Sequence, residues 1–483
     1  MDLHSPPGSS AQIAPRPGIA DRLATLLRIP TVSAERREHT DAFIRFPQEL
    51  ARLYPLIHER LDRRIVDGTG LLFHWRGSSP TEPLVLMAHW DVVPAPAQWQ
   101  RTGWQSDPFA GQLLDHPPVT GEHFTTETGP AVCGRGALDD KGPLVVLLEA
   151  VENLLAAGFT PAHDVWLVLG GDEEVQGTDA VAISELIRTE LNGAQPWLVL
   201  DEGGAVTDSP LSFVDGTCAM IGLAEKGVLT VRLTATGGGG HASSPPAQTP
   251  VSRLLRALRR IERSPFTARL NSTTAAMLGA FAPLTSGAAS KILPTAAQAG
   301  PVTARALAAM GGEAAALVRT TVAVTGLQAG SADNVLPDEA TATLNCRIAP
   351  GDTVESVIEG LRRRIKDPDI RIETSDGHGP SPESPAKGEA FASVRDAVGI
   401  SWPEATAVPY LLMAATDSRH FHTWCQNVYR FAPLQMSAQQ RAGIHGENEW
   451  VSQDSLERGE LFHRSLILGR GGEFGTAAAG GLR

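Results

Sequence analysis

The stretch VWLVLGGDEEVQGT (residues 165–178) joins an apolar run of five residues to three adjacent carboxylates. An uninterrupted apolar run of this length is typical of a strand buried on both faces. The carboxylates of Asp172, Glu173 and Glu174 repel one another when they are ionised. The cluster is therefore either a solvated acidic turn or a place where the fold brings positive charge to the end of a strand.

Two further apolar runs, at residues 84–88 and 197–200, have the same character as the run at 165–169. Helical patterns at residues 142–157 and 178–190 lie between these runs. Continuous hydrophobic strands that alternate with helices predict an α/β fold with a central, mostly parallel sheet covered on both faces.

The pattern changes near Ala224. Residues 227–236 and 339–348 alternate apolar and polar side chains, as half-exposed strands do, and helical patterns follow each of them. This order predicts a small α+β domain inserted into the larger one; residues 273–330 receive no assignment. The predicted division is a catalytic domain in two parts (14–223 and 379–468), a lid or dimerisation domain (224–378) and flexible ends (1–13 and 469–483).

The bulk composition restricts the function. A chain of 483 residues predicts two domains, and a net charge of −13 argues against a nucleic-acid partner. The N-terminal residues lack the pattern of a signal peptide, and no apolar run is long enough to span a bilayer, so no membrane partner is expected. Four widely spaced cysteines without a CxxC pair predict a reducing, cytoplasmic location.

Histidine and acidic residues gather where the predicted strands end. His89 and Asp91 follow the run at 84–88, and a carboxylate two residues along an extended chain can orient a metal-binding imidazole. Taken singly, such a histidine could equally bond to nearby backbone, and Asp139 could simply cap a helix. Together, the clusters supply the nitrogen and oxygen ligands that suit zinc, manganese or cobalt.

Five segments give the pattern a family resemblance: HWDVVPA, GRGALDDKG, DEEVQGT, LDEGG and IHGENEW. They resemble, in order, the five characteristic segments of the M20 metallopeptidases, in particular the aminoacylase-1 and carboxypeptidase S branch. TDSRHF and YRFAPL match that branch as well, and the resemblance extends from about residue 22 to 468. It implies a zinc-peptidase-like catalytic domain with an inserted ferredoxin-like lid that usually dimerises.

The resemblance also implies a role for each matching residue. Two Zn²⁺ ions, with Co²⁺ or Mn²⁺ as alternatives, would be held by His89, Asp139 as the bridge, Glu174 and His445. Asp91 would orient His89, and Glu173 would be the general base. The remaining ligand is Asp201 or Glu202: aminoacylase-1 favours Glu202, whereas other members use the residue placed like Asp201.

Residues outside the metal site match positions that bind substrate in the family. His241 is placed to reach the active site of a partner subunit in a homodimer and to polarise the scissile carbonyl. Asn334 and Arg347 match lid positions that help to place the substrate. Arg419 either pairs with a substrate carboxylate or forms an internal salt bridge.

The resemblance thus implies a metal-dependent hydrolase that cleaves the amide bond of an N-acyl amino acid or short peptide with a free carboxylate. A metal-activated water and the Glu173 base would perform the reaction. The alternatives are a dipeptidase, desuccinylase or carbamoyl hydrolase on the same fold, or a binding protein without catalysis.

Overall fold

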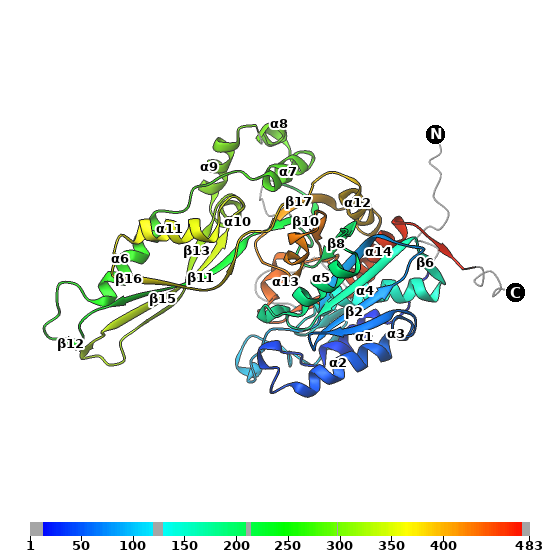
Figure 1. The fold of residues 1–483 in the computed structure, drawn as a ribbon, viewed down its shortest axis with the longest axis horizontal. Coiled ribbons are helices and arrows are strands. Elements are labelled where there is room, and N and C mark those ends of the chain that lie inside the picture. Colours follow the sequence, from blue (N-terminus) through cyan, green and yellow to red (C-terminus); the bar gives the residue numbers. More distant parts are fainter. Residues whose placement is uncertain (1–12, 119–128, 209–213, 297, 476–483) are drawn as a thin grey trace.

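The computed structural model describes residues 13–118, 129–208, 214–296 and 298–475. Figure 1 shows an α/β body on one side and an elongated lid on the other, connected by strands that run from one to the other.

The α/β body is organised around a nine-stranded sheet with the order β1-β2-β7-β3-β8-β18-β10-β17, in which β9 pairs with β10. Its central strands β7, β3, β8 and β18 are parallel, as predicted. Towards the edges the sheet is mixed, because the pairs β1–β2, β2–β7 and β18–β10 are antiparallel. The strands are β1 (Asp62–Val66), β2 (Gly70–Trp75), β3 (Ser79–His89), β7 (His163–Gly170), β8 (Leu198–Asp201), β9 (Val206–Asp208), β10 (Thr217–Glu225), β17 (Thr406–Leu412) and β18 (Val428–Arg430).

Helices cover both faces of this sheet. Leu84 and Leu86 of β3 pack into the larger buried cluster with helices α1 to α4, α12 and α14, while Val85 and Met87 pack on the other face with Ile183 of α5. The alternation explains why the strand is apolar at every position. The helices are α1 (Ile19–Leu27), α2 (Thr40–Leu53), α3 (Pro55–Arg60), α4 (Lys141–Ala156), α5 (Asp179–Glu190), α12 (Glu389–Ser401), α13 (Ala438–Gly443) and α14 (Gln453–Gly469).

The lid contains a four-stranded antiparallel sheet with the order β13-β15-β11-β16. Helices α6 and α11 pack on one face through Leu254, Leu258, Val357 and Leu361. This β-α-β-β-α-β order is the ferredoxin-like arrangement. The elements are β11 (Gly227–Thr236), α6 (Pro250–Arg263), β13 (Thr321–Ala329), β15 (Glu339–Ile348), α11 (Val354–Ile365) and β16 (Ile370–His378).

The stretch without a sequence assignment is mostly helical. It forms α7 (Ser272–Phe281), α8 (Gly287–Ala296), α9 (Gly300–Met310) and α10 (Gly312–Ala316) before it enters β13. Met277 and Phe281 of α7 share a buried cluster with Met220 of β10 and Val408 of β17. This segment, inserted within the lid sequence, therefore packs on the α/β body.

Small sheets complete the fold. They are the three-stranded β4 (Gln112–Leu114), β5 (Ala131–Cys133) and β19 (Trp450–Ser452), and the pairs β6 (Phe159–Pro161) with β20 (Gly472–Phe474) and β12 (Gly240–His241) with β14 (Val335–Leu336). The tail from residue 469 was expected to be flexible, but part of it forms β20, which pairs with β6. The Phe474 ring lies 5.2 Å from the ring of Phe159. Residues 1–12 and 476–483, also expected to be flexible, lie outside the described residues. Among the described helices, none combines the length and apolar character needed to cross a bilayer.

His463 of α14 makes the stability of the fold sensitive to acid. Its side chain is buried, and burial lowers its pKa from 6.5 to about 3. Between these values the unfolded chain binds a proton that the folded chain does not, so stability must fall as the pH drops below 6.5. At about pH 4.5 the expected loss is about 2–3 kcal/mol of unfolding free energy relative to neutral pH.

The comparison of thermal unfolding at neutral and acid pH tests this expectation. His463→Leu should flatten the acid side of the stability profile, whereas His116→Leu, at an exposed position, should leave it unchanged. An equally steep acid loss in His463→Leu would assign the effect to other groups.

Candidate metal centre

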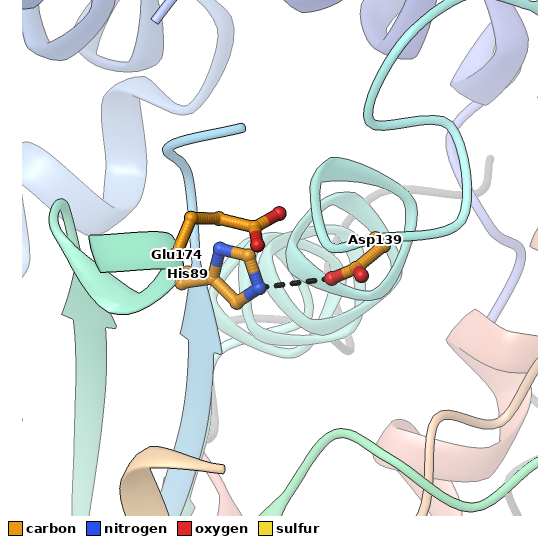
Figure 2. Close-up of side chains that lie close together, drawn as sticks. All are labelled: His89, Asp139 and Glu174. Atoms are coloured by element: carbon orange, nitrogen blue, oxygen red, sulfur yellow. Dashed lines mark hydrogen bonds and ion pairs between the residues drawn. The ribbon is translucent and has the colours of Figure 1, made fainter. Parts of the chain in front are cut away.

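The ends of β3 and β7 bring the predicted ligands together. The two strands are parallel neighbours, with His89 opposite Gly170, so His89 and the acidic turn after Gly170 leave the sheet at the same edge. Asp139 comes from the loop before α4 and approaches from the side (Figure 2). The fold therefore converts three separate sequence clusters into one site.

Asp139 lies between the two histidines. Its Oδ1 is 3.0 Å from His89 Nε2, and its Oδ2 is 3.0 Å from His445 Nε2. One carboxylate oxygen thus faces each imidazole, which is the arrangement that a carboxylate bridging two ions requires.

Glu174 completes the cluster from the short 3₁₀ turn Glu173–Val175. Its Oε2 is 3.1 Å from His445 Nε2, and its Oε1 is buried without a hydrogen-bond partner among the described residues. Ligand atoms of His89, Asp139 and Glu174 all lie within 4.8 Å of one another. This donor set, with a buried carboxylate oxygen that lacks a partner, fits a divalent cation such as zinc.

Asp91 fixes the positions of its neighbours. Its carboxylate accepts hydrogen bonds from the backbone N–H groups of Glu173 and Glu174, both at 3.1 Å. The same carboxylate lies 3.3 Å from His89 Nδ1, which is also 3.1 Å from the Asp91 backbone oxygen. Asp91 therefore orients the imidazole and the acidic turn at the same time.

Glu173 lies beside the cluster and makes no contact with either histidine that would make it a ligand. Burial raises the pKa of its carboxyl group well above the usual range, and the negative charges of Asp417 and Asp139 act in the same direction. A raised pKa is what a carboxylate needs in order to accept and then release a proton near neutral pH.

Asp201 is the last residue of β8, and Glu202 follows it. Asp201 is almost completely buried, and its Oδ2 accepts a 2.8 Å hydrogen bond from the backbone N–H of Ser418. Burial raises the pKa of Glu202 well above its usual range, and the charges of Asp139 and Asp140 add to the effect. Asp201 is thus tied to a neighbouring loop, whereas Glu202 lies in the electrostatic field of the acidic cluster.

Glu449 organises the loop that carries Asp139, a role that sequence reasoning missed. Its carboxylate is fully buried and accepts backbone N–H groups of Gly136, Leu138 and Asp139 at 2.8–3.0 Å. Arg135 Nη1 donates to the same carboxylate at 2.8 Å. The available signal was the second acid of the IHGENEW segment, four residues after His445.

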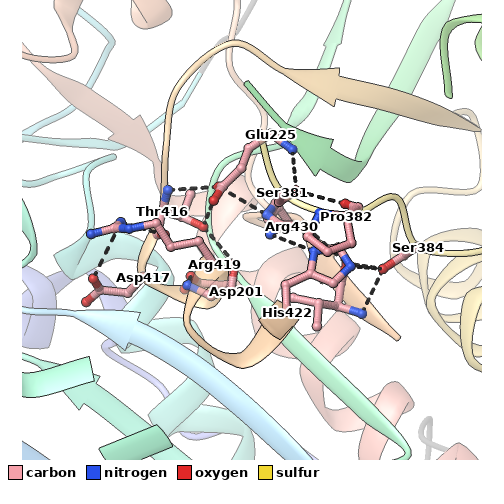
Figure 3. Close-up of polar contacts among 12 residues, drawn as sticks. Asp201, Glu225, Ser381, Pro382, Ser384, Thr416, Asp417, Arg419, His422 and Arg430 are labelled. Atoms are coloured by element: carbon pink, nitrogen blue, oxygen red, sulfur yellow. Dashed lines mark hydrogen bonds and ion pairs between the residues drawn. The ribbon is translucent and has the colours of Figure 1, made fainter. Parts of the chain in front are cut away.

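The loop that contains Arg419 is held by a second buried network (Figure 3). Glu225 Oε2 accepts a 2.9 Å hydrogen bond from the Thr416 N–H and lies 3.3 Å from Arg430 Nε. Arg419 Nη1 donates to the Thr416 oxygen at 2.8 Å and lies 3.9 Å from Asp417. Arg419 therefore makes both of these contacts within its own loop.

Two of the predicted lid residues, His241 and Asn334, lie apart from this centre. His241 is exposed on β12, at the far tip of the lid in Figure 1. Asn334 lies beside it, because its backbone oxygen accepts a 3.1 Å hydrogen bond from the N–H of Ala242. Arg347, on β15, donates through Nε to Asn345 at 3.0 Å. Within one chain these residues do not join the metal cluster.

Comparisons with known proteins agree with the geometry. Residues 85–469 match the pattern of peptidase family M20/M25/M40. The chain is 32% identical over 450 residues to the mouse N-fatty-acyl-amino acid synthase/hydrolase PM20D1, covering 90% of this chain and 84% of that protein. It is 29% identical to the probable carboxypeptidase S-like 2 of Dictyostelium discoideum, covering 93% and 84%.

Solved structures show the same fold. The M20 family metallo-carboxypeptidase Sso-CP2 of Sulfolobus solfataricus superposes with a TM-score of 0.67 at 16% identity, covering 94% of this chain and 99% of that one. The di-peptidase Dug1p of Saccharomyces cerevisiae gives a TM-score of 0.64 at 16% identity, covering 93% and 95%. At such low identity the likeness concerns the fold alone.

Proposed function

The chain belongs to peptidase family M20/M25/M40 and is a metallohydrolase, and from this premise we propose that it hydrolyses N-acyl amino acids at a centre with two zinc ions. The observation that carries the proposal is Asp139, whose two oxygens each face one histidine. The sequence similarity to an N-fatty-acyl-amino acid synthase/hydrolase supports this choice of substrate.

The protein residues divide the work between metal binding and proton transfer. His89, Asp139, Glu174, His445 and one acid of the 201–202 pair would hold the ions, which when bound polarise the amide carbonyl and activate water. Asp91 keeps His89 and the acidic turn in place. Glu449 does the same for the loop of Asp139.

Glu173 moves the proton. It accepts a proton from the attacking water while the oxygen of that water forms a bond to the acyl carbon. When the C–N bond breaks, Glu173 donates the proton to the leaving nitrogen, so that a carboxylate and a free amino acid are released. Its burial near other acids favours this return of the proton.

The lid is proposed to act between two copies of the chain. His241 lies at the lid tip, far from the metal centre of its own chain, so a second subunit is needed to bring it to an active site. There its imidazole would stabilise the negative charge on the carbonyl oxygen. Asn334, beside it, and Arg347 would contact the substrate from the lid, and Arg419 from the α/β body.

A short peptide with a free carboxyl end is the second candidate substrate, favoured by the similarity to a carboxypeptidase S-like protein. Release of amine from N-acyl leucines and from leucine-containing dipeptides, measured with zinc, cobalt and manganese in turn, decides between the two candidates. If every dipeptide is hydrolysed faster than the N-acyl leucines, short peptides are the substrate and the proposal of N-acyl amino acids is wrong. We also propose a reducing, cytoplasmic compartment, supported by the wide spacing of the four cysteines and the absence of a CxxC pair in the sequence.

We expect Glu202 to be a metal ligand and Asp201 to have a structural role. Glu202→Gln should bind one metal ion fewer per chain, because an amide is a poor ligand in this site. Asp201→Asn should retain both ions, since asparagine still offers an oxygen to the N–H of Ser418. Metal content after dialysis at fixed free zinc measures the difference. The opposite pattern would assign the ligand role to Asp201.

A further inference from the structure

A cavity of about 440 Å³ opens next to the metal centre and is not used by the reaction as described. Gly203 and Ile444 line it, and they are the chain neighbours of Glu202 and His445. Consecutive α-carbons lie only about 3.8 Å apart, so two walls of the cavity continue directly from candidate metal ligands.

The lining is mainly apolar and adaptable. Three of the seven methionines of the chain contribute to it, together with aromatic and aliphatic side chains: Met220, Met413, Met436, Tyr410, Leu412 and Ile444. Methionine side chains adjust to ligands of variable shape, and cavities of this size and lining are typical of sites for apolar small molecules.

The polar groups at the cavity are already paired within the protein. Tyr410 Oη donates a 2.8 Å hydrogen bond to Glu313, and Arg441 Nη1 donates to the Met436 oxygen at 2.9 Å and to Thr207. Because these polar groups already have partners in the protein, the cavity is better suited to a hydrocarbon group than to a carboxylate. Glu313 belongs to α10, so the inserted helical segment supplies one wall.

Gly203 is the lining residue next to Glu202, and its lack of a side chain leaves space there. Its φ of +117° is a conformation that side chains disfavour, and an added Cβ would lie 2.8 Å from a methyl carbon of Leu412. A residue without a side chain therefore separates the acid cluster from the apolar lining.

We propose that this cavity binds the hydrocarbon chain of the substrate's acyl group and makes the enzyme select medium and long acyl chains. The inference rests on the proposed function, because the acyl carbon must lie at the metal centre for its chain to enter beside Gly203. Each CH₂ buried in the cavity should raise kcat/KM roughly two- to four-fold until the cavity is full.

The test uses the zinc-loaded protein and the acetyl, hexanoyl, decanoyl and palmitoyl derivatives of leucine. Ala414 lines the cavity and its side chain is exposed, so Ala414→Trp narrows the space without disturbing the core. The ratio of kcat/KM for decanoyl-leucine to that for acetyl-leucine should fall at least about ten-fold in Ala414→Trp. Ala414→Ser, with nearly the original volume, should keep the ratio.

An unchanged ratio in Ala414→Trp, or no preference for longer chains in the original protein, would overturn the inference. Failure of the proposed function has a different signature, namely no hydrolysis of any acyl-leucine. In that case calorimetric titration with decanoate still decides: binding that weakens at least about ten-fold in Ala414→Trp supports the cavity assignment, and absence of binding overturns it.

Discussion

Glu173→Gln is expected to lower kcat by about 10³–10⁴-fold while KM changes little, because the substitution removes the proton acceptor and leaves the shape of the site intact. Glutamine can neither take the proton from water nor return it to the leaving nitrogen. Hydrolysis of an N-acyl leucine, followed by amine release at saturating substrate, measures the effect. The metal content should remain that of the original protein, since Glu173 is not among the clustered ligand residues.

Asp172 provides the matched control for this experiment. It is the adjacent acid of the same turn, but its carboxylate accepts the backbone N–H groups of Thr178 and Asp179 and does not face the histidines. Asp172→Asn should therefore keep kcat within about three-fold, because an acid that accepts N–H groups at the start of α5 contributes to stability more than to turnover. If Glu173→Gln retains turnover, Glu173 is not the general base. If the same variant loses bound metal, Glu173 is a metal ligand.

The parts of the fold that could be predicted share one property: their sequence pattern reports burial directly. The run at residues 84–88 is apolar throughout because both faces of β3 are covered, and it correctly indicated a central strand. The alternation of apolar and polar residues in 227–236 likewise indicated a strand with one covered face. This strand is β11, whose buried side chains pack into the core of the lid.

The inserted helices could not be predicted in this way. Residues 272–316 are rich in alanine and threonine, so the contrast between apolar and polar faces that marks an amphipathic helix is weak. Their burial depends on packing against one face of β10 and β17, which is a tertiary contact that the local sequence pattern does not contain. The cavity proposed to bind the acyl chain also depends on this contact, because Glu313 of α10 is one of its lining residues.

Two members of the metal cluster could be predicted from strand ends, because His89 ends β3 and Glu174 follows β7. Asp139 and His445 lie on loops next to helices, and their roles were implied by the family resemblance. Two of the acids that support the site and its neighbouring loop could not be predicted. Glu449 and Glu225 are acids whose sequence neighbourhood resembles that of many surface acids, and only the folded chain shows that each is fully buried and surrounded by donors. Buried carboxylates persist when such donors satisfy them.

His241→Ala is expected to lower kcat by about 10²–10³-fold, the usual loss when one donor to a developing oxyanion is removed. The more specific expectation concerns mixed dimers. A dimer of one His241→Ala chain and one Glu173→Gln chain, isolated with two different affinity tags, should recover about half of the original activity. In this dimer one site combines an intact Glu173 with the His241 of the partner subunit, whereas the other site lacks both groups.

The reciprocal dimer makes the experiment decisive. It pairs an unaltered chain with a chain that carries both substitutions, so every site lacks either Glu173 or the histidine of its partner subunit. It should be nearly inactive if His241 acts between subunits, although it contains one complete chain. If His241 acts within its own chain, the results must be reversed: the reciprocal dimer would retain about half of the activity and the first dimer almost none. The exposed position of β12 at the tip of the lid leads us to expect the first result.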